Sequence, residues 1–499
     1  MIPKVSEDIP KNWTSAKLGC IAQLIRGVSY KKNEGIHEPQ IGYVPILRAT
    51  NINKELNYLN LVYVPSSKLK EEQYVKELDI IIAMSSGSKN LVGKAAQAKH
   101  NFLGGFGAFC GLIRVNPKLN KKFIGYFFQS NAYNKSISQL SSGVNINNLR
   151  RENVLSIKLS LPPLPEQHRI VDKVEELFSR LDAGIESLKK VRTQIKRYRH
   201  AVLKHAFEGK LTAAWREANK HQLEPASAIL EIFKTKGKKC IAKRQKNLPF
   251  PDTADLYELP DGWEWTSLHN IADMSSGKAF KKSEYAQTGV RLLQIANVSF
   301  GKIVWDNVSY LPSSYLEKHP KLVLKPGDIL IALNRPILND MLKIGILKDC
   351  DLPAILYQRV GRFDFFNTHV INKSYFFYLV QSPYFIRKVK ISLQGVDQPF
   401  INKPALLKIS VPLPPLLEQK KIVEEIERRF SIVDRVEEIV EQNLKKAERL
   451  RQSILKKAFE GKLVPQDPTD EPASVLLERI KAEKEKNATE KDQRRRSKK

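Results

Sequence analysis

Apolar residues recur at every seventh position along two stretches of this chain. A spacing of seven is typical of the seam of a coiled coil, and it is narrower than the apolar stripe of an ordinary surface helix. The series are Val174, Leu181, Leu188, Ile195 and Val202 in the first stretch, and Ile426, Val433, Val440, Ala447 and Ile454 in the second. We therefore predict two long helices that pack lengthwise in antiparallel directions. A continuous first helix from Glu166 to Phe207 would be on the order of 60 Å long.

A second series accompanies the first in each stretch, as the a/d pattern of a coiled coil requires. Its members are Leu177, Gly184, Val191 and Tyr198, and then Val436, Asn443 and Leu450. Asn443 interrupts the apolar pattern. A buried Asn can fix the register of two helices, because misaligned pairing leaves its amide without a partner. A surface Asn on a frayed seam is an equal alternative, and we count Asn443 as a candidate contact between the helices.

The two predicted helices belong to an internal repeat that covers most of the chain. LPPLPEQ begins at Leu161 and LPPLLEQ at Leu413, and the helices end in HAFEGKL and KAFEGKL. Upstream of each helix, IPKNW at residues 9–13 recurs as LPDGW at 259–263, and EPASAILEIF recurs downstream as EPASVLLERI. A repeat must be found before a fold is named, since one unit then predicts the other. The order is globular, helical, globular, helical.

The globular segments read as α+β. Short apolar runs broken by Gly, Asn, Ser and Pro predict strands of an irregular, mostly β domain, with one helix beginning near Lys121. We expect the following boundaries: a first globular domain at 1–160, a helical spacer with a short docking helix at 161–233, a basic linker at 234–256, a second globular domain at 257–410, a second spacer and docking helix at 411–481, and a charged, disordered tail at 482–499.

The charge of the chain suggests its partner. A formal charge of +30 over 499 residues favours a polyanion, because clustered Lys and Arg gain free energy by releasing counterions from phosphates. Nucleic acid is favoured over a membrane surface or mere solubility. No signal peptide or spanning segment is evident, so we expect a cytoplasmic protein without a membrane partner. The four Cys lie far apart, which argues against a zinc site or a disulfide framework.

Polar side chains gather where the predicted strands end in loops. Arg and Asn can pair with base edges, while Ser and Lys suit phosphate oxygens. Turn formation alone also explains Asn, Ser and Gly in such loops, so the set is more informative than any member. The candidate nucleic-acid contacts are Arg26, Lys31, Lys32, Arg48, Asn51, Ser86, Lys89 and Asn145 in the first globular segment, and Lys278, Lys281, Lys282, Gln294, Asn297, Asn334, Arg335, Gln358, Arg359 and Gln398 in the second.

Motifs for catalysis are not apparent. Every Gly-Lys pair is followed by Ala, Leu, Lys or Ile rather than Ser or Thr, so no phosphate-binding loop of the ATPase type is present. Neither Pro-Pro pair carries the Asn or Asp expected of an amino-group methyltransferase, and no His-Glu-x-x-His or Ser-His-Asp arrangement stands out. We predict no catalytic, metal or cofactor site. A DNA methyltransferase or nuclease with divergent motifs, and a coiled-coil scaffold without a DNA role, remain the alternatives.

The duplicated LPP-x-x-EQ start, the AFEGKL helix ends and the LPDGW-like segments resemble the specificity (S) subunit of type I restriction-modification systems, over nearly the whole chain. The resemblance implies that each globular segment is a target recognition domain for one half of an asymmetric, bipartite double-stranded DNA site. It implies that the antiparallel helices set the spacing and dock two modification subunits, which methylate adenine N6 with S-adenosylmethionine. Two restriction subunits would add ATP- and Mg-dependent translocation and cleavage.

Overall fold

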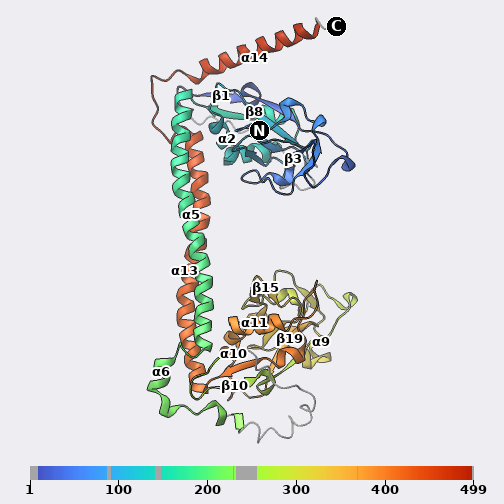
Figure 1. Ribbon diagram of the computed structural model, residues 1–499, viewed down its shortest axis with the longest axis vertical. Coiled ribbons are helices and arrows are strands. Elements are labelled where there is room, and N and C mark those ends of the chain that lie inside the picture. Colours follow the sequence, from blue (N-terminus) through green and yellow to red (C-terminus); the bar gives the residue numbers. More distant parts are fainter. Residues whose placement is uncertain are drawn as a thin grey trace. The chain divides into compact units, whose positions relative to one another are not determined.

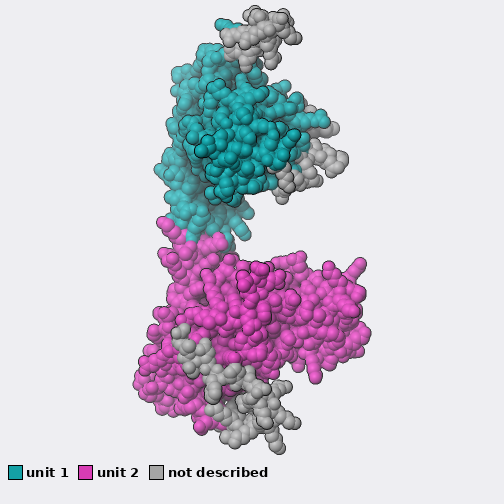
Figure 2. Space-filling view, turned by 45° about the vertical axis from the view of Figure 1, so that its right-hand side comes forward, with its two compact units in different colours: residues 1–189, 441–499 teal, residues 190–440 magenta. Residues whose placement is uncertain are grey.

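The computed structural model describes residues 9–86, 91–140, 148–228, 230–231, 256–367 and 369–496. The chain forms two compact units (Figure 2): unit 1 comprises Met1–Lys189 and Glu441–Lys499, and unit 2 comprises Lys190–Val440. Each unit contains one globular segment together with part of each long helix. This division places the two globular segments in separate cores, and each core also takes in parts of both long helices.

Two sheets and a strand pair form the β structure of unit 1. The four-stranded sheet has the order β2–β8–β5–β6 with every neighbour antiparallel, and the three-stranded sheet has the order β4–β3–β7 with β3 parallel to β7. The pair β1–β9 joins the two ends of the globular segment. The strands are β1 (Thr14–Lys17), β2 (Ala22–Arg26), β3 (Tyr43–Leu47), β4 (Val62–Pro65), β5 (Ile80–Ala83), β6 (Ala95–Gln97), β7 (Gly105–Phe106), β8 (Cys110–Val115) and β9 (Lys158–Leu161).

Short helices cover the sheets of unit 1. They are α1 (Leu18–Ile21), α2 (Lys121–Gln129), α3 (Asn131–Leu140) and α4 (Arg151–Ser156). The prediction of one helix from about Lys121 onward was wrong, because Ser130 adopts an extended conformation between α2 and α3. Its hydroxyl donates to the Phe127 carbonyl and accepts the Tyr133 amide, which ends one helix and begins the next.

Unit 2 repeats this arrangement. Its four-stranded sheet has the order β11–β19–β14–β17, its three-stranded sheet has the order β13–β12–β18, and β10 pairs with β20. A hairpin, β15 (Ile337–Leu338) and β16 (Met341–Leu342), extends the loop after β14. The strands are β10 (Glu264–Ser267), β11 (Ala272–Ser276), β12 (Val290–Leu293), β13 (Ser309–Leu311), β14 (Ile329–Ala332), β17 (Ile344–Ile346), β18 (Ala354–Leu356), β19 (Val360–Phe365) and β20 (Ser410–Leu413), and the helices are α9 (Tyr315–Lys318), α10 (Lys373–Leu379), α11 (Pro383–Ile391) and α12 (Lys403–Leu407).

The two long helices are α5 (Leu164–Phe207) and α13 (Leu416–Phe459), each 44 residues long. They lie antiparallel (Figure 1), so that in unit 1 the first part of α5 packs on the last part of α13, and in unit 2 the reverse holds. The first apolar series lies at the contact. Leu181 and Leu188 are half-buried, and the other members are buried, namely Val174, Ile195, Val202, Ile426, Val433, Val440, Ala447 and Ile454. The predicted α+β fold with an antiparallel helix pair is confirmed.

The second apolar series does not form the second line of contact. Tyr198, Val436 and Leu450 have exposed fractions of 43%, 38% and 51%, and Asn443 is half-buried. The contact line runs one position later, through Phe178 and Arg451 in unit 1, where the guanidinium lies 4.1 Å from the ring centroid. The places of Tyr198, Val436 and Leu450 were therefore predicted wrongly, because a charged residue stacked on a ring occupies the line of contact, whereas Leu177 does pack against the core of unit 1. The register role of Asn443 stays a prediction.

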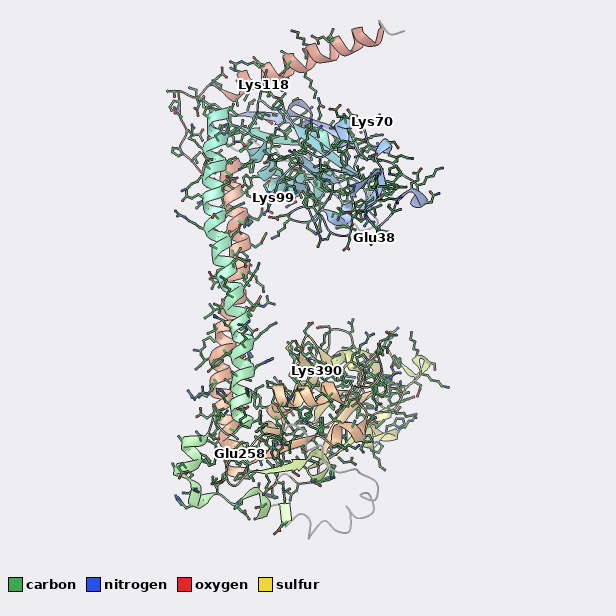
Figure 3. All side chains as sticks on the ribbon, viewed as in Figure 1. Glu38, Lys70, Lys99, Lys118, Glu258 and Lys390 are labelled. Carbon is green, nitrogen blue, oxygen red and sulfur yellow. The ribbon has the colours of Figure 1, made fainter. Side chains whose placement is uncertain are left out.

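The last helix, α14 (Ala473–Arg496), continues through the segment predicted as a disordered tail. Ala473, Leu476, Leu477 and Ile480 are buried in the core of unit 1, and Lys118 forms an ion pair of 2.9 Å with Glu483 beyond them (Figure 3). Lys, Glu, Ala, Gln and Arg dominate residues 481–496, and all are good helix formers. This composition accounts for a helix where charge density alone suggested disorder.

The EPAS segments dock in the same way in both units. The Ala473 amide donates to the Asn12 carbonyl at 2.9 Å in unit 1, and the Ala226 amide donates to the Gly262 carbonyl at 3.0 Å in unit 2. Both donors begin a helical stretch, although only residues 226–228 and 230–231 of the first are described. Residues 232–255, which include nearly all of the predicted basic linker, lie outside the described residues.

Candidate nucleic-acid interface

Several strands of unit 1 end at one edge of the structure. The register pairs Arg26 with Gly111 and Ala83 with Cys110, so the loops after β2 and β5 and before β8 meet there. The loop after β3 joins them, because β3 runs parallel to β7 and the Gly107 amide donates to the Leu47 carbonyl at 2.9 Å. We call residues 26–32, 48–51, 84–86 and 107–109 the edge loops of unit 1.

The edge loops of unit 2 are residues 277–282, 294–297, 333–335, 357–359 and 394–400. They are tied together through their main chains. The Gln358 amide donates to the Lys278 carbonyl at 3.1 Å, the Leu333 amide to the Arg359 carbonyl at 2.9 Å, and the Arg335 amide to the Pro399 carbonyl at 2.7 Å. Arg335 and Arg359 have positive φ angles of 46° and 66°, which only a few per cent of non-glycine residues adopt. The tertiary contacts hold both arginines in these turns.

One glycine in each unit permits the loops to approach this closely. A Cβ atom on Gly27 would lie 2.1 Å from the Gly107 carbonyl oxygen, and one on Gly277 would lie 2.1 Å from the Leu356 carbonyl oxygen. Any other residue would therefore push the loop after β2 or β11 away from its neighbour. The two glycines fix the backbone frame of both edges.

Most of the predicted contact residues lie on these edges, and they differ in exposure. The exposed ones are Arg26, Lys31, Lys278, Lys281, Lys282, Arg335, Arg359 and Gln398, and the half-buried ones are Arg48, Ser86, Gln294, Asn334 and Gln358. Lys89, Asn145 and the side chain of Lys32 lie outside the described residues. The exposed set contains seven cations, which suits contact with phosphates.

Asn51 and Asn297 face inward. Each side chain is buried, and its oxygen accepts an amide at 2.9 Å, from Arg48 in unit 1 and Gln294 in unit 2. Both N–H groups of each amide donate to main-chain carbonyls at 2.9–3.0 Å. The two residues thus hold the turns η2 (Ala49–Asn51) and η9 (Ile295–Asn297). We assign them a structural role. Neither side-chain amide has an N–H group left to donate to a nucleic acid, although the sequence predicted such a contact.

Arg48 and Gln294 occupy equivalent positions in front of these turns. Arg48 Nη2 donates to the Asn60 carbonyl at 3.0 Å, while its Nε is buried and lacks a hydrogen-bond partner among the described residues. Gln294 Nε2 donates to the Tyr285 hydroxyl at 3.2 Å. The same backbone position therefore presents a cation in unit 1 and an amide in unit 2.

The LPP-x-x-EQ motif forms the joint between helix and globular segment, and its Glu and Gln make the contacts. Glu166 accepts the indole N–H of Trp13 at 2.9 Å and the Gln466 amide at 2.6 Å. In unit 2 Glu418 accepts the indole N–H of Trp263 at 2.8 Å. A buried Trp N–H needs an acceptor, so the recurrence of Trp and Glu at matched places was the signal that could have found this pair.

The Gln of the motif anchors the first helix after the sheets. Gln167 accepts the Asn120 amide at 3.0 Å, and Gln419 accepts the Asn372 amide at 2.7 Å. Asn120 and Asn372 are in turn the N-caps of α2 and α10. Both glutamines are fully buried. The motif thus fixes the globular segment to the helix pair in each unit by the same hydrogen bonds.

A cluster of rings and charges makes a second joint. In unit 1 Tyr126 meets Phe178 edge-on at 5.6 Å, and Arg451 lies over Phe178 and pairs with Asp182. In unit 2 the same places hold Tyr378 and Phe430, 5.9 Å apart, with Arg199 over Phe430 and paired with Asp434. Each ion pair joins α5 to α13, and each Tyr comes from the globular segment.

Burial of Glu166 has a consequence for pH dependence. Desolvation raises the pKa of its carboxyl, although the hydrogen bonds from Trp13 and Gln466 oppose this. A raised folded-state pKa means that the native state binds the proton more tightly than the unfolded chain. The resulting stabilisation is present below the unfolded pKa of about 4.3 and is lost as pH rises through the folded pKa.

We expect Glu166→Gln to remove this pH dependence. We compare the free energies of unfolding of the two proteins and take the native value minus the variant value. This difference should fall as pH rises above about 4.3, by about 1.4 kcal/mol for each unit by which the pKa is raised. Urea titrations of both proteins at a series of pH values measure the difference, in which the other carboxylates cancel. A difference that stays constant with pH would contradict the raised pKa.

Metal and thiol chemistry receive no support from the described parts of the chain. No group of three or more His, Cys, Asp or Glu there could hold a metal ion. Cys20, Cys110 and Cys350 are free thiols, and burial raises the pKa of Cys110 to about 12. Cys240 lies outside the described residues. Among the helices of the described ranges, none has the length and apolarity to cross a membrane.

Comparison with known proteins identifies the family. The family model for the type I restriction modification DNA specificity domain matches residues 10–197 and again 260–449. The chain is 33% identical to the type I restriction enzyme MjaVIII specificity subunit of Methanocaldococcus jannaschii, over 91% of this chain and 94% of that one. It is 31% identical to the EcoKI specificity subunit of Escherichia coli, over 98% and 99%.

A solved structure shares the fold. A chain from a structure on the assembly and conformational transition of a type I R-M system superimposes with a TM-score of 0.59 at 19% identity, covering 92% of this chain and all of that chain. The two family matches coincide with the two copies of the repeat, each consisting of a globular segment and the greater part of one long helix. The chain therefore belongs to the family of type I restriction-modification DNA specificity subunits.

Proposed function

We propose that unit 1 and unit 2 each read one half of an asymmetric, bipartite site in double-stranded DNA. The observation that carries this is the pair of edge loops, because matching positions of the two units present different side chains. Arg48 stands where unit 2 has Gln294, and Ser86 stands where unit 2 has Arg335. Equivalent frames with different side chains suit two different short sequences. The chain is a recognition subunit and not itself a catalyst.

The helix pair supplies the spacing between the half-sites in this proposal. Helices of 44 residues are about 66 Å long at 1.5 Å per residue, and half-sites read from one side of a duplex lie about 34 Å apart. Buried or half-buried apolar residues at every seventh position make the pair a stiff element. Each helix also passes from one unit into the other, so a change in helix length alters the gap between half-sites.

The catalytic partners dock on the helices in the same proposal. Two modification subunits carry S-adenosylmethionine and methylate adenine N6 in each half-site, and two restriction subunits carry ATP and Mg. Support comes from the membership of the chain in the specificity family and from its own lack of a metal cluster in the described residues. The net charge of +30 supplies the sequence-independent part of DNA binding through contacts with phosphates.

Arg359→Ala tests the reading of DNA by unit 2. Arg359 is exposed on a turn whose carbonyl is held by Leu333. Loss of an arginine that pairs with guanine should cost about 1–3 kcal/mol of binding and relax specificity at one base pair of one half-site. The test uses the chain in complex with its modification subunits, with the site taken from sequencing of methylated adenines and affinities from fluorescence anisotropy.

The matched control is Lys325→Ala, which removes an exposed cation from the turn that precedes β14, at the end opposite the edge loops. We expect the control to leave sequence preference unchanged. Methyl transfer by the chain alone, with S-adenosylmethionine and DNA but no partner, would show an enzyme instead. Binding without preference for any sequence, unaffected by Arg359→Ala, would show a scaffold without a reading role.

A further inference from the structure

Phe109 is a large apolar side chain on the edge loops of unit 1. It lies in the turn between β7 and β8, and its exposed fraction is 69%. The exposed cations Arg26 and Lys31 belong to the same set of loops. Single exposed apolar residues are common on protein surfaces, so exposure alone says little. Its place among cations and the way its backbone is held say more.

The backbone of this turn is fixed on three sides. The Phe109 carbonyl accepts the amides of Met84 at 2.8 Å and Ser85 at 3.1 Å, and the Cys110 amide donates to the Gly107 carbonyl at 2.8 Å. Gly27 allows the loop after β2 to pack directly on Gly107. The ring is therefore presented from a rigid position, which lowers the entropy that is lost when a ligand contacts it.

Phe109 in unit 1 and Arg359 in unit 2 occupy matching positions in the strand order, although of the two only Arg359 has a positive φ angle. Each is the last residue before a strand of the four-stranded sheet, β8 or β19, and the carbonyl of each accepts an amide from the residue after β5 or β14. The strand pairs continue the match, because Cys110 faces Ala83 and Val360 faces Ala332. One position of the frame thus carries a ring in one unit and a guanidinium in the other.

The major groove offers different partners to these two side chains. A guanidinium donates to O6 and N7 of guanine, whereas the apolar group that the major groove offers to a ring is the 5-methyl group of thymine. We propose that Phe109 contacts the 5-methyl group of one thymine in the half-site that unit 1 reads. The proposal rests on the proposed function, since it assigns a base to one position of the edge loops.

Removal of the thymine methyl group tests the contact directly. Each thymine of the methylated site is replaced in turn by deoxyuridine, and the duplexes compete for the chain in complex with its modification subunits. We expect one duplex, altered in the unit 1 half-site, to bind the native protein about fourfold more weakly, the effect of one buried methyl group. Phe109→Ala should bind that duplex and the thymine duplex equally.

Two variants separate contact from folding. Phe109→Leu keeps an apolar side chain and should retain part of the discrimination against deoxyuridine. Leu103→Ala removes an apolar side chain of 85% exposure from the loop before β7, at the other end of that strand. This control should discriminate as the native protein does.

Three results would overturn the inference. Phe109→Ala could keep the full discrimination at every thymine, or no thymine methyl group of the unit 1 half-site could matter to the native protein. Phe109→Ala could also weaken the association with modification subunits while leaving DNA discrimination intact, which would place the ring in a protein interface. A native complex that prefers no sequence at all would instead refute the proposed function on which the inference rests.

Discussion

Replacement of Glu418 by alanine should destabilise unit 2 by about 3–5 kcal/mol, the usual result of removing one partner from a buried ion pair. The Glu418 carboxylate is fully buried and accepts three donors: the Trp263 indole at 2.8 Å, the Thr212 hydroxyl at 2.7 Å and Arg216 Nε at 3.2 Å. Alanine leaves all three without this acceptor. Arg216 lies 5.6 Å from the Trp263 ring centroid and would keep its charge in a half-buried place.

Hydrogen exchange localises this effect better than a single unfolding curve, because a chain with two cores need not unfold in two states. We expect faster exchange in β10 and β20, which flank the joint in unit 2, and unchanged exchange in β1 and β9 of unit 1. Glu424→Ala is the control on the same helix, since its side chain is 67% exposed and its loss should be within about 0.5 kcal/mol. Equal protection in the two variants would contradict the role of Glu418.

Replacement of residues 25–148 by residues 275–400 of the same chain should yield a specificity subunit that reads a symmetric DNA site. The inserted segment carries the edge loops of unit 2 and brings its own joint residues, with Tyr378 for Tyr126 and Asn372 for Asn120. We expect the half-site of unit 2 to be unchanged and the half-site of unit 1 to become its inverted copy. Sequencing of methylated adenines in cells that carry the complete system reads the outcome.

A matched exchange in the other direction, residues 275–400 replaced by 25–148, should duplicate the other half-site. If both halves of the site changed after a single exchange, the two units would not read DNA independently. If the chimaera kept the native site, the sequence preference would reside in the helices or in the partner subunits. The exchange leaves Trp13, Glu166 and Gln167 in place, so the joint of unit 1 is retained.

The long helices were predictable because their signals are local. A heptad period fixes which residues are buried, and a proline pair followed by Glu-Gln marks the start, so α5 begins within two residues of the predicted Glu166 and ends at the predicted Phe207. The contact line through Phe178 and Arg451 was missed because the hydrophobic pattern favours a leucine over an arginine at a buried position. Arg451 occupies that position only because Phe178 and Asp182 are both in reach.

The edge loops were predictable as a group but not residue by residue. Turn residues at the ends of the predicted strands marked the loops in which polar side chains gather. Antiparallel pairing brings the end of one strand next to the start of its neighbour, so these loops meet at one edge. The inward hydrogen bonds of Asn51 leave no local signal, because its acceptors are carbonyls of Asn57 and Leu59, which only the folded turn brings near. Phe109 falls outside the predicted set because its ring carries no polar atom. The bond from Trp13 to Glu166 joins residues 153 apart, and such a distance leaves no local pattern.

Gly27 and Gly277 each make one close contact between loops of their own unit. These contacts constrain how new specificities arise in evolution. The neighbours of the two glycines already differ between the two copies, with Arg26 and Val28 in one and Ser276 and Lys278 in the other. A mutation at either glycine forces two loops apart and would be eliminated whichever DNA site the subunit reads. In the proposed function, mutations beside them change only the side chains that are presented to DNA. Descendants of one ancestral repeat can thus diverge in the sequences that they read while sharing an unaltered contact beneath the reading surface.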